Sequence, residues 1–437
     1  MGKRIVWIVM GLCLALGLGV GFTAPRASGG ASAKEAALLP GGDAWAAALP
    51  RDPEQATQAY MARIPPQARA RSEAYFRGGY LIQAWSLAAT LAAGLLLLAT
   101  GAAAAMRDRA ERAARRPFAQ ALIFALQYLA AMWVLDLPTA VITGFLREHR
   151  YGMATQAFGP WLGEALVSLA VSALLMAPAI ALFYGMVRRR PRTWWAWGAG
   201  GSVVFMVVAI AIAPPLIDPL FNKYRPLEDG PARREILSLA RANGIPARDV
   251  LQFDASRQTT KVSANVSGLL GTTSIRLNDN LLNRCSLPEI KAVMAHEMGH
   301  YVLNHVWKFV LFLGLVLAGA FAAGAWAFEA LRRRFPAWDI RDAADPAGLP
   351  LLALVLAVTL TAAGPLVGSM IRVQETEADQ FGVNASQEPD GFAEAQLKLI
   401  EYRAPDPGPV EEFLFYDHPS PRKRILTAMR WKAEHSR

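Results

Sequence analysis

The feature that most constrains the fold of this chain is a series of long apolar segments. They occupy residues 5–22, 80–106, 119–145, 161–187, 194–216, 306–331 and 349–371. A helix needs about 20 apolar residues to cross a bilayer, and these segments are close to that length or longer. Charged residues make up only 18% of the chain, whereas about 25% is usual for a soluble domain. We therefore predict a mainly α, polytopic membrane protein with about seven transmembrane helices, whose first partner is the lipid bilayer.

The first apolar segment admits two interpretations. Residues 5–22 follow Lys3 and Arg4, and the Ala-Ser-Ala sequence at residues 31–33 would suit cleavage of a signal peptide. The apolar run is long for a signal peptide and near the length of a span. We therefore favour an uncleaved anchor.

Basic residues in the short loops predict an orientation. Clusters at residues 3–4, 107–116, 188–192 and 332–334 fall on one side of the membrane if the chain crosses it seven times. The positive-inside rule makes that side cytoplasmic. The polar block after the fifth span and the C-terminal tail are then expected on the extracytoplasmic side of a bacterial inner membrane. No basic stripe is interleaved with aromatic residues, so we expect no nucleic-acid partner despite the net charge of +10.

The order of polar and apolar segments predicts two domains. Residues 1–220 are interpreted as an N-terminal membrane region with five spans and an extramembrane loop at 24–78. Residues 221–437 are interpreted as a small α+β domain that includes the last two spans, 306–331 and 349–371.

The polar parts of the second domain have recognisable periodicities. Residues 227–243 have the pattern of an amphipathic helix, and residues 250–253 and 261–277 alternate as strands do. Residues 372–437 are predicted to be helical, with breaks at a run of three closely spaced prolines.

The stretch AVMAHEMGHYVLNH, residues 292–305, carries a pattern typical of a metal site. His296 and His300 are four residues apart, so they project from one face of a helix and can reach one zinc ion at about 2 Å. Glu297 is placed to act as a general base on a water in an open coordination position. The alternative is a buried helix whose polar residues fit the pattern by chance. Burying them without a partner would be costly, so we favour zinc.

A third metal ligand is expected just after the last span. In IRVQETEADQFG, residues 371–382, Glu375 and Asp379 are four residues apart and share a helical face. Glu375 suits a ligand, and Asp379 suits a carboxylate that accepts a proton from a ligating histidine. The alternative is an exposed charged turn. His305 lies off the face of the first two histidines, and we interpret it as a neighbour of the site and not as a ligand.

Four further segments accompany the HEMGH pentapeptide. They are EHRYGMATQAFGPWLGE (148–164), PLIDPLFNKYRPLEDG (215–230), RVQETEAD (372–379) and DHPSPRKRI (417–425). With these motifs the chain resembles the integral-membrane zinc metalloproteases of the CAAX prenyl protease type, and it is similar to the heat-shock membrane protease HtpX. The resemblance runs from about residue 60 onward. It implies transmembrane helices that enclose a hydrated chamber, with one zinc ion near one end.

The resemblance also implies a role for each residue of the site. The zinc ligands would be His296, His300 and Glu375, with Glu297 as base and proton shuttle. Asp379, Arg372 and Arg424 would support them, and His418 would stabilise the developing oxyanion. The substrate-binding edge strand would contain Ala264, Asn265 and Val266, although the family often has Asn-Ala-Tyr where this chain has Asn-Val-Ser. Backbone pairing to such an edge can hold an extended peptide.

These observations predict a membrane-embedded zinc endopeptidase whose substrates are peptides or proteins, in the processing or quality control of membrane or exported proteins. One alternative is an intramembrane protease of the site-two type, whose zinc helix lies within a span. Here residues 292–300 follow a long polar block. The other is a membrane scaffold or sensor with a relic metal site, which would have no need of Glu297.

Two acidic residues lie within predicted spans. Asp136 and Glu164 are each expected either to line a hydrated chamber or to form a structural pairing.

Overall fold

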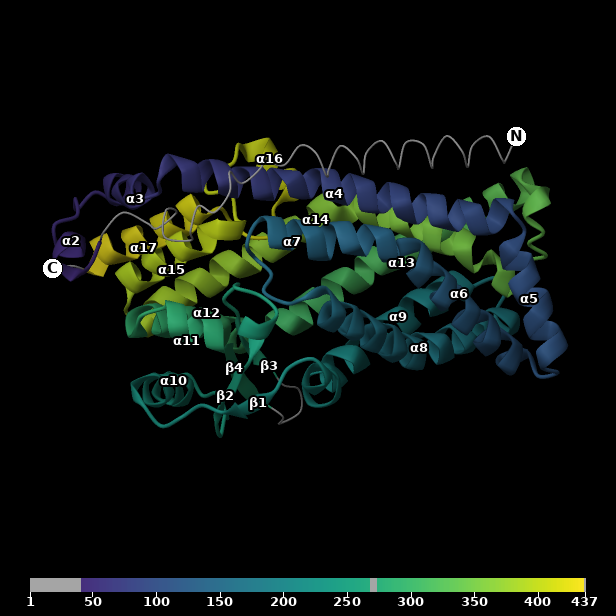
Figure 1. Ribbon diagram of the computed structural model, residues 1–437, viewed down its shortest axis with the longest axis horizontal. Coiled ribbons are helices and arrows are strands. Elements are labelled where there is room, and N and C mark those ends of the chain that lie inside the picture. The colour runs from purple at the N-terminus through teal and green to yellow at the C-terminus, as the bar shows by residue number, and fades with distance from the viewer. Residues whose placement is uncertain (1–40, 268–272, 436–437) are drawn as a thin grey trace.

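The membrane-crossing helices lie side by side along the long axis of the molecule (Figure 1). The computed structural model describes residues 41–267 and 273–435. In these residues six helices are long and apolar enough to cross a membrane: Pro66–Ala99, Pro117–Arg150, Phe158–Arg189, Trp194–Leu220, His305–Arg334 and Pro346–Ser386. They correspond to six of the seven predicted spans, and the first, at residues 5–22, lies outside the described residues.

The labels of Figure 1 follow the chain through these spans. They are α4 (Pro66–Ala99), α6 (Pro117–Ala140) with its continuation α7 (Arg147–Arg150), α8 (Phe158–Arg189), α9 (Trp194–Ile212), α13 (His305–Arg334) and α14 (Leu349–Ser386).

The predicted bounds of the second span are wrong at both ends. Helix α4 begins at Pro66 and ends at Ala99, and Gly101, with a φ of 73°, precedes a separate helix α5 (Ala102–Ala113). The predicted loop at 24–78 is, from residue 43 onward, mostly helical, with α2 (Asp43–Ala47) and α3 (Pro53–Ala62) before α4. Hydropathy locates only the apolar part of a helix. The polar first turns of α4 are rich in Ala, Arg and Gln, which favour helix without being apolar.

A small sheet lies beside the ends of the spans. Its strands are β1 (Tyr224–Pro226), β2 (Val250–Phe253), β3 (Ala264–Ser267) and β4 (Ser274–Asn278), in the order β1-β2-β4-β3. The outer pairs are antiparallel and the central pair β2–β4 is parallel. The strand predicted at 250–253 is confirmed as β2, and the run predicted as interrupted strands at 261–277 contains β3 and most of β4. Strand β3 is at the edge of the sheet.

Helices α10 (Pro231–Ala242), α11 (Asp279–Arg284) and α12 (Leu287–Val302) pack on this sheet. Their shared core includes Ile236, Ile275, Leu277, Met294 and Met298, which are fully buried. On its other side α12 contacts α15 (Pro389–Leu399), which packs with α17 (Pro421–His435) and α3 around a second core. Helix α12 therefore lies between two apolar cores, outside the spans.

Small residues allow α12 and α14 to approach closely. A Cβ atom added at Gly382 of α14 would lie 2.8 Å from the backbone nitrogen of His296. A Cβ at Gly299 of α12 would lie 3.2 Å from the Cα of Ala378. Helix α14 continues without a break from its apolar part to Ser386, so the residues beyond the membrane are held by the same rigid element.

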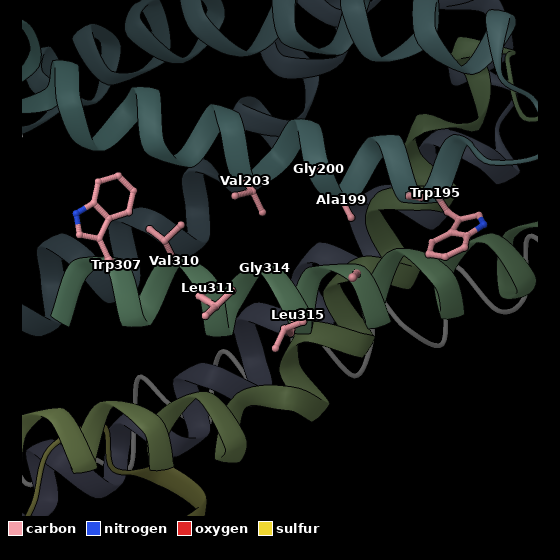
Figure 2. A pocket seen from close by; sticks show the side chains of 11 residues that line it. Trp195, Ala199, Gly200, Val203, Trp307, Val310, Leu311, Gly314 and Leu315 are labelled. Atoms are coloured by element: carbon pink, nitrogen blue, oxygen red, sulfur yellow. The ribbon is translucent and has the colours of Figure 1, made fainter. Parts of the chain in front are cut away.

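An apolar groove of about 510 Å³ lies between α9 and α13. Trp195 and Trp307 lie at its two ends (Figure 2). Its lining has no titratable side chain, so the groove offers no candidate catalytic or metal-binding residue.

The two acidic residues predicted within spans have different surroundings. Glu164 pairs with Arg257 at 3.0 Å and accepts a hydrogen bond from Gln258, which is a structural pairing. Asp136 lines a hollow of about 310 Å³ with Thr90 and Trp133.

We predict that Gly382→Ala destabilises the protein by about 1–3 kcal/mol, because the new methyl group forces α14 away from α12. The matched control is Gly364→Ala on the same helix, where an added Cβ meets nothing within 4 Å. Thermal unfolding of the purified protein in detergent checks this, with a lower Tm expected for Gly382→Ala only. Equal Tm values for the two variants would contradict the close packing.

Candidate metal centre

The helix that carries the HEMGH sequence begins at a well-defined cap. Ser286 precedes α12, and the Glu289 carboxylate accepts a hydrogen bond from the Ser286 backbone N–H at 3.1 Å. Lys398 of α15 donates to the same carboxylate at 2.6 Å. These bonds fix the start of α12, and with it the direction in which His296 and His300, about two and a half and three and a half turns later, project.

The three predicted ligands meet at the contact of α12 and α14. The Nε2 atoms of His296 and His300 are 3.1 Å apart, and each is 3.3 Å from an oxygen of Glu375. These are the only three residues in the described chain whose His, Cys, Asp or Glu donor atoms converge in this way, within 4.8 Å of one another. The structure therefore brings together the residues that the sequence separates by 79 positions, from His296 to Glu375.

The donor set fits a tetrahedral metal ion. Bonds of about 2.0 Å place the ligand atoms of such an ion about 3.3 Å apart, which is close to the observed separations. The Oε2 atom of Glu375 is buried and accepts no well-formed hydrogen bond from a described residue, although it lies 3.3 Å from His296 Nε2. A buried carboxylate oxygen without a partner is costly, and so are two imidazole nitrogens that face each other. A cation among the three atoms satisfies all of them.

The outer nitrogen of His296 is held by a charged pair. Asp379, which is 1% exposed, lies 2.9 Å from His296 Nδ1. Arg424 donates to both oxygens of Asp379, from Nε at 2.8 Å and from Nη2. Burial lowers the pKa of His296, but the carboxylates of Asp379 and Glu375 beside its ring outweigh burial and raise that pKa to about 9.

The outer nitrogen of His300 has a different partner, His305, which the sequence predicts to be a neighbour of the site although not this contact. His305 Nδ1 lies 2.9 Å from His300 Nδ1, and His305 Nε2 lies 3.0 Å from Glu377. His305 is 2% exposed, and it does not belong to the group of three ligand atoms. Asn304, with a φ of 57°, ends α12 and starts α13, so the chain turns and His305 faces back toward His300. Periodicity along one helix cannot predict this contact, because the contact depends on the break between α12 and α13.

A cavity of about 310 Å³ opens beside the three ligand atoms. Glu297 lines it, and burial raises the pKa of its carboxyl. His418 also lines it, with Nε2 3.4 Å from Glu375 and Nδ1 2.8 Å from Asp417. Burial lowers the pKa of His418, against the opposing effect of Asp417. The predicted base and the predicted oxyanion donor therefore face one space.

Arg372 lies further from the ligands than expected for a residue that supports them directly. It donates to the backbone carbonyl groups of Glu412 and Tyr416 and to Ser369 Oγ. No hydrogen bond joins it to the three ligand residues within the described chain. It holds the segment that leads to His418 because Tyr416 is two residues before it.

The predicted substrate residues lie on edge strand β3. Ala264 lines the cavity, and Asn265 is exposed. Ala264 and Val266 pair with Leu277 and Ile275 of β4, so the opposite edge of β3 is not covered by a strand of the described sheet.

We predict that His305→Ala weakens metal binding about 10- to 100-fold, because His300 loses the group that orients its ring. His305→Asn, which keeps a polar side chain at that position, should restore part of the affinity. His435→Ala is the control, since His435 is exposed near the end of α17. A competition assay with a chromophoric zinc chelator measures all three. Unchanged affinity in His305→Ala would contradict an orienting role.

Metal binding should release a proton below pH 9. With a pKa of about 9, His296 is protonated at neutral pH in the metal-free protein, and a metal ion must displace that proton from Nε2. The apparent affinity should therefore rise with pH up to about 9. Calorimetry of zinc binding in buffers of different ionisation enthalpy should show about one proton released per ion between pH 7 and pH 8. No release in that range would contradict the raised pKa.

The fold and the site together define a membrane metallopeptidase. Residues 226–432 match the model of peptidase family M48, and residues 51–223 match the model described as CAAX prenyl protease N-terminal, five membrane helices. The two models together cover most of the chain. It therefore belongs to peptidase family M48 and is a zinc metalloendopeptidase with an integral-membrane region, which confirms the predicted family and enzyme class.

Similar proteins include relatives from bacteria and yeast. The "Uncharacterized metalloprotease YhfN" of Bacillus subtilis is 29% identical over 312 residues, 69% of this chain and 73% of that protein. "CAAX prenyl protease 1" of Saccharomyces cerevisiae is 32% identical over 195 residues, 44% of this chain and 43% of that protein. The crystal structure of S. mikatae Ste24p has a TM-score of 0.65 and 21% identity, covering 97% of this chain and 98% of that one. This last likeness shows a shared fold.

Proposed function

We propose that this chain holds one zinc ion with His296, His300 and Glu375 and uses it to hydrolyse peptide bonds. The observation that carries the proposal is the convergence of one donor atom each from His296, His300 and Glu375, with Glu297 at the adjoining cavity. A scaffold with a relic site would not need a carboxylate there. Helix α12 lies outside the six spans, which disfavours an arrangement of the site-two type.

The zinc ion, when bound, supplies a Lewis acid that polarises a carbonyl group and lowers the pKa of a water. Glu297 accepts the proton of the attacking water at its carboxylate and returns it to the amine that leaves. Burial raises the pKa of Glu297 above that of an ordinary glutamate, which brings it closer to the working pH of a general base.

His418 is proposed to stabilise the negative charge that develops on the carbonyl oxygen. Its Nδ1 faces Asp417 at 2.8 Å, which leaves Nε2 directed toward the cavity. Nε2 can donate to an oxyanion when the ring carries both protons, a form that the Asp417 carboxylate favours and that burial disfavours. Arg372 holds the backbone just before this pair, so we propose that it positions His418.

Asp379, Arg424 and His305 are proposed to orient the two ligating imidazoles. Each ligand then has one nitrogen for the ion and one for a fixed partner, which sets its tautomer and ring angle.

The substrate is proposed to be an extended peptide that pairs with the free edge of β3 at Ala264, Asn265 and Val266. The site lies beside the ends of the spans, so we propose that membrane or exported proteins supply these peptides. The matches to the prenyl proteases named as relatives cover less than half of those proteins, and we do not extend their named substrate class to this chain.

We propose that the site faces the extracytoplasmic side of a bacterial inner membrane. Arg107 of α5 and Arg188 of α8 line one hollow with Arg341. Helix α5 lies at the end of the bundle opposite α12 (Figure 1). Arg332, Arg333 and Arg334 end α13 at that same end. Because several arginines gather at this end of the bundle, the positive-inside rule favours the cytoplasmic side for this end.

We predict that Glu297→Gln lowers kcat about 100- to 10,000-fold and leaves the zinc content unchanged, because it removes a base and no ligand. Glu375→Ala should lose the bound zinc. Glu388→Gln is the matched control, because Glu388 pairs with Lys291 away from the cavity. Casein digestion and metal analysis of the purified variants measure both effects. Activity that survives Glu297→Gln would contradict the mechanism.

The orientation predicts the behaviour of a fusion after Arg437. Alkaline phosphatase, which is active only outside the cytoplasm, should be active there, and a cytoplasmic reporter should not. The reverse result would overturn the proposed orientation.

A further inference from the structure

The catalytic cavity contains two arginines in very different situations. The Arg424 guanidinium is held by both oxygens of Asp379. Arg403 also lines the cavity, yet its Nη1 is buried and has no hydrogen-bond partner. No ion pair joins its guanidinium to any carboxylate in the part of the chain that the structure describes. Burial, together with the charge of Arg424, lowers the pKa of Arg403, and the charges of Asp417 and Glu375 oppose this effect only in part.

The backbone of Arg403 is fixed although its side chain is unpaired. Ser72 of α4 donates to the Arg403 carbonyl at 2.9 Å, and the Arg403 N–H donates to Ile400 at 3.2 Å. The side chain is therefore presented to the cavity from a rigid position. A buried guanidinium normally has an acidic partner, so its lack of one within the protein calls for a partner from outside.

A second unpaired polar group lines the same cavity. Gln396 of α15 is 2% exposed, and its Oε1 has no hydrogen-bond partner. No described residue bonds its amide nitrogen either. An amide can turn either of its ends toward a bound group, so Gln396 can donate to an acceptor that Arg403 also binds.

We propose that Arg403 and Gln396 form a subsite that binds a carboxylate group of the substrate peptide. A guanidinium offers two parallel donors that match the two oxygens of a carboxylate, and the Gln396 amide supplies a further donor. The carboxylate belongs either to the C-terminus of the peptide or to an Asp or Glu side chain near the cleaved bond. This inference rests on the proposed peptidase function and adds a specificity element to it.

The test uses three peptide pools of random sequence without acidic residues, competing in one reaction with the zinc-loaded full chain in detergent. The first pool has a free C-terminal carboxylate, the second a C-terminal amide, and the third the amide with one fixed internal Glu. Mass spectrometry of the products gives relative kcat/KM values. We expect the wild type to prefer one or both carboxylate pools over the amide pool about 10- to 100-fold, the range for a charge-assisted hydrogen bond.

The variants connect that preference to the subsite. In Arg403→Gln the ratio between the carboxylate and amide pools should fall toward 1, and in Arg403→Lys it should be intermediate. Gln396→Leu should lower it in part. The control is Arg430→Gln, an arginine on the outer face of α17 with a side chain 62% exposed, which should keep the wild-type ratio. The pool that is favoured distinguishes a terminal carboxylate from an acidic side chain.

A binding measurement separates the failure of this inference from the failure of the peptidase function. In Glu297→Gln, fluorescence anisotropy of labelled pools should show tighter binding of a carboxylate pool than of the amide pool, and Arg403→Gln added to that background should remove the difference. Equal binding of all pools, or a preference that survives Arg403→Gln, overturns the subsite. Absence of cleavage in every pool would instead contradict the peptidase function, while the binding comparison still decides the subsite.

Discussion

The close contact between α12 and α14 is the interaction on which the rest of the structure depends. Two of the proposed ligand atoms come from α12 and the third from α14, so they converge only while the two helices touch. Gly382 against the His296 backbone and Gly299 against Ala378 permit that approach. Because α14 is also a membrane-crossing helix, its position in the bilayer and the position of Glu375 are set by one continuous element. This explains how a site outside the spans is kept in register with them.

Each of the two histidines of the site has its own set of charged or polar partners behind it. His296 is backed by Asp379 and Arg424, whereas His300 is backed by His305 and Glu377, so the two imidazoles are held by partners of different strength. The paired and buried Asp379–Arg424 couple gives the firmer support, because two hydrogen bonds and opposite charges act in a site with little water. The His305–Glu377 couple also includes Lys308 and reaches the exposed start of α13. Arg403 is the arginine of the cavity that forms no ion pair with any described residue.

Features with a local signal could be predicted from the sequence. The apolar segments located six spans, alternation located β2 at residues 250–253, and the spacing of His296 and His300 indicated a metal site before any contact was known. Features that depend on contacts between distant segments could not. Hydropathy missed the polar first turns of α4, and no periodicity relates His305 to His300 across the break at Asn304. Arg403 and Gln396 lie about 100 residues beyond Glu297, and only the folded chain places them in one cavity.

X-ray absorption at the zinc edge of the purified wild-type protein tests the central claim most directly, because it reports the atoms that touch the ion. The account predicts one zinc per chain, with two imidazole nitrogens and at least one carboxylate oxygen in its coordination shell at about 2.0–2.2 Å. A shell with a single imidazole, or one that is the same in Glu375→Ala as in the wild type, would contradict it.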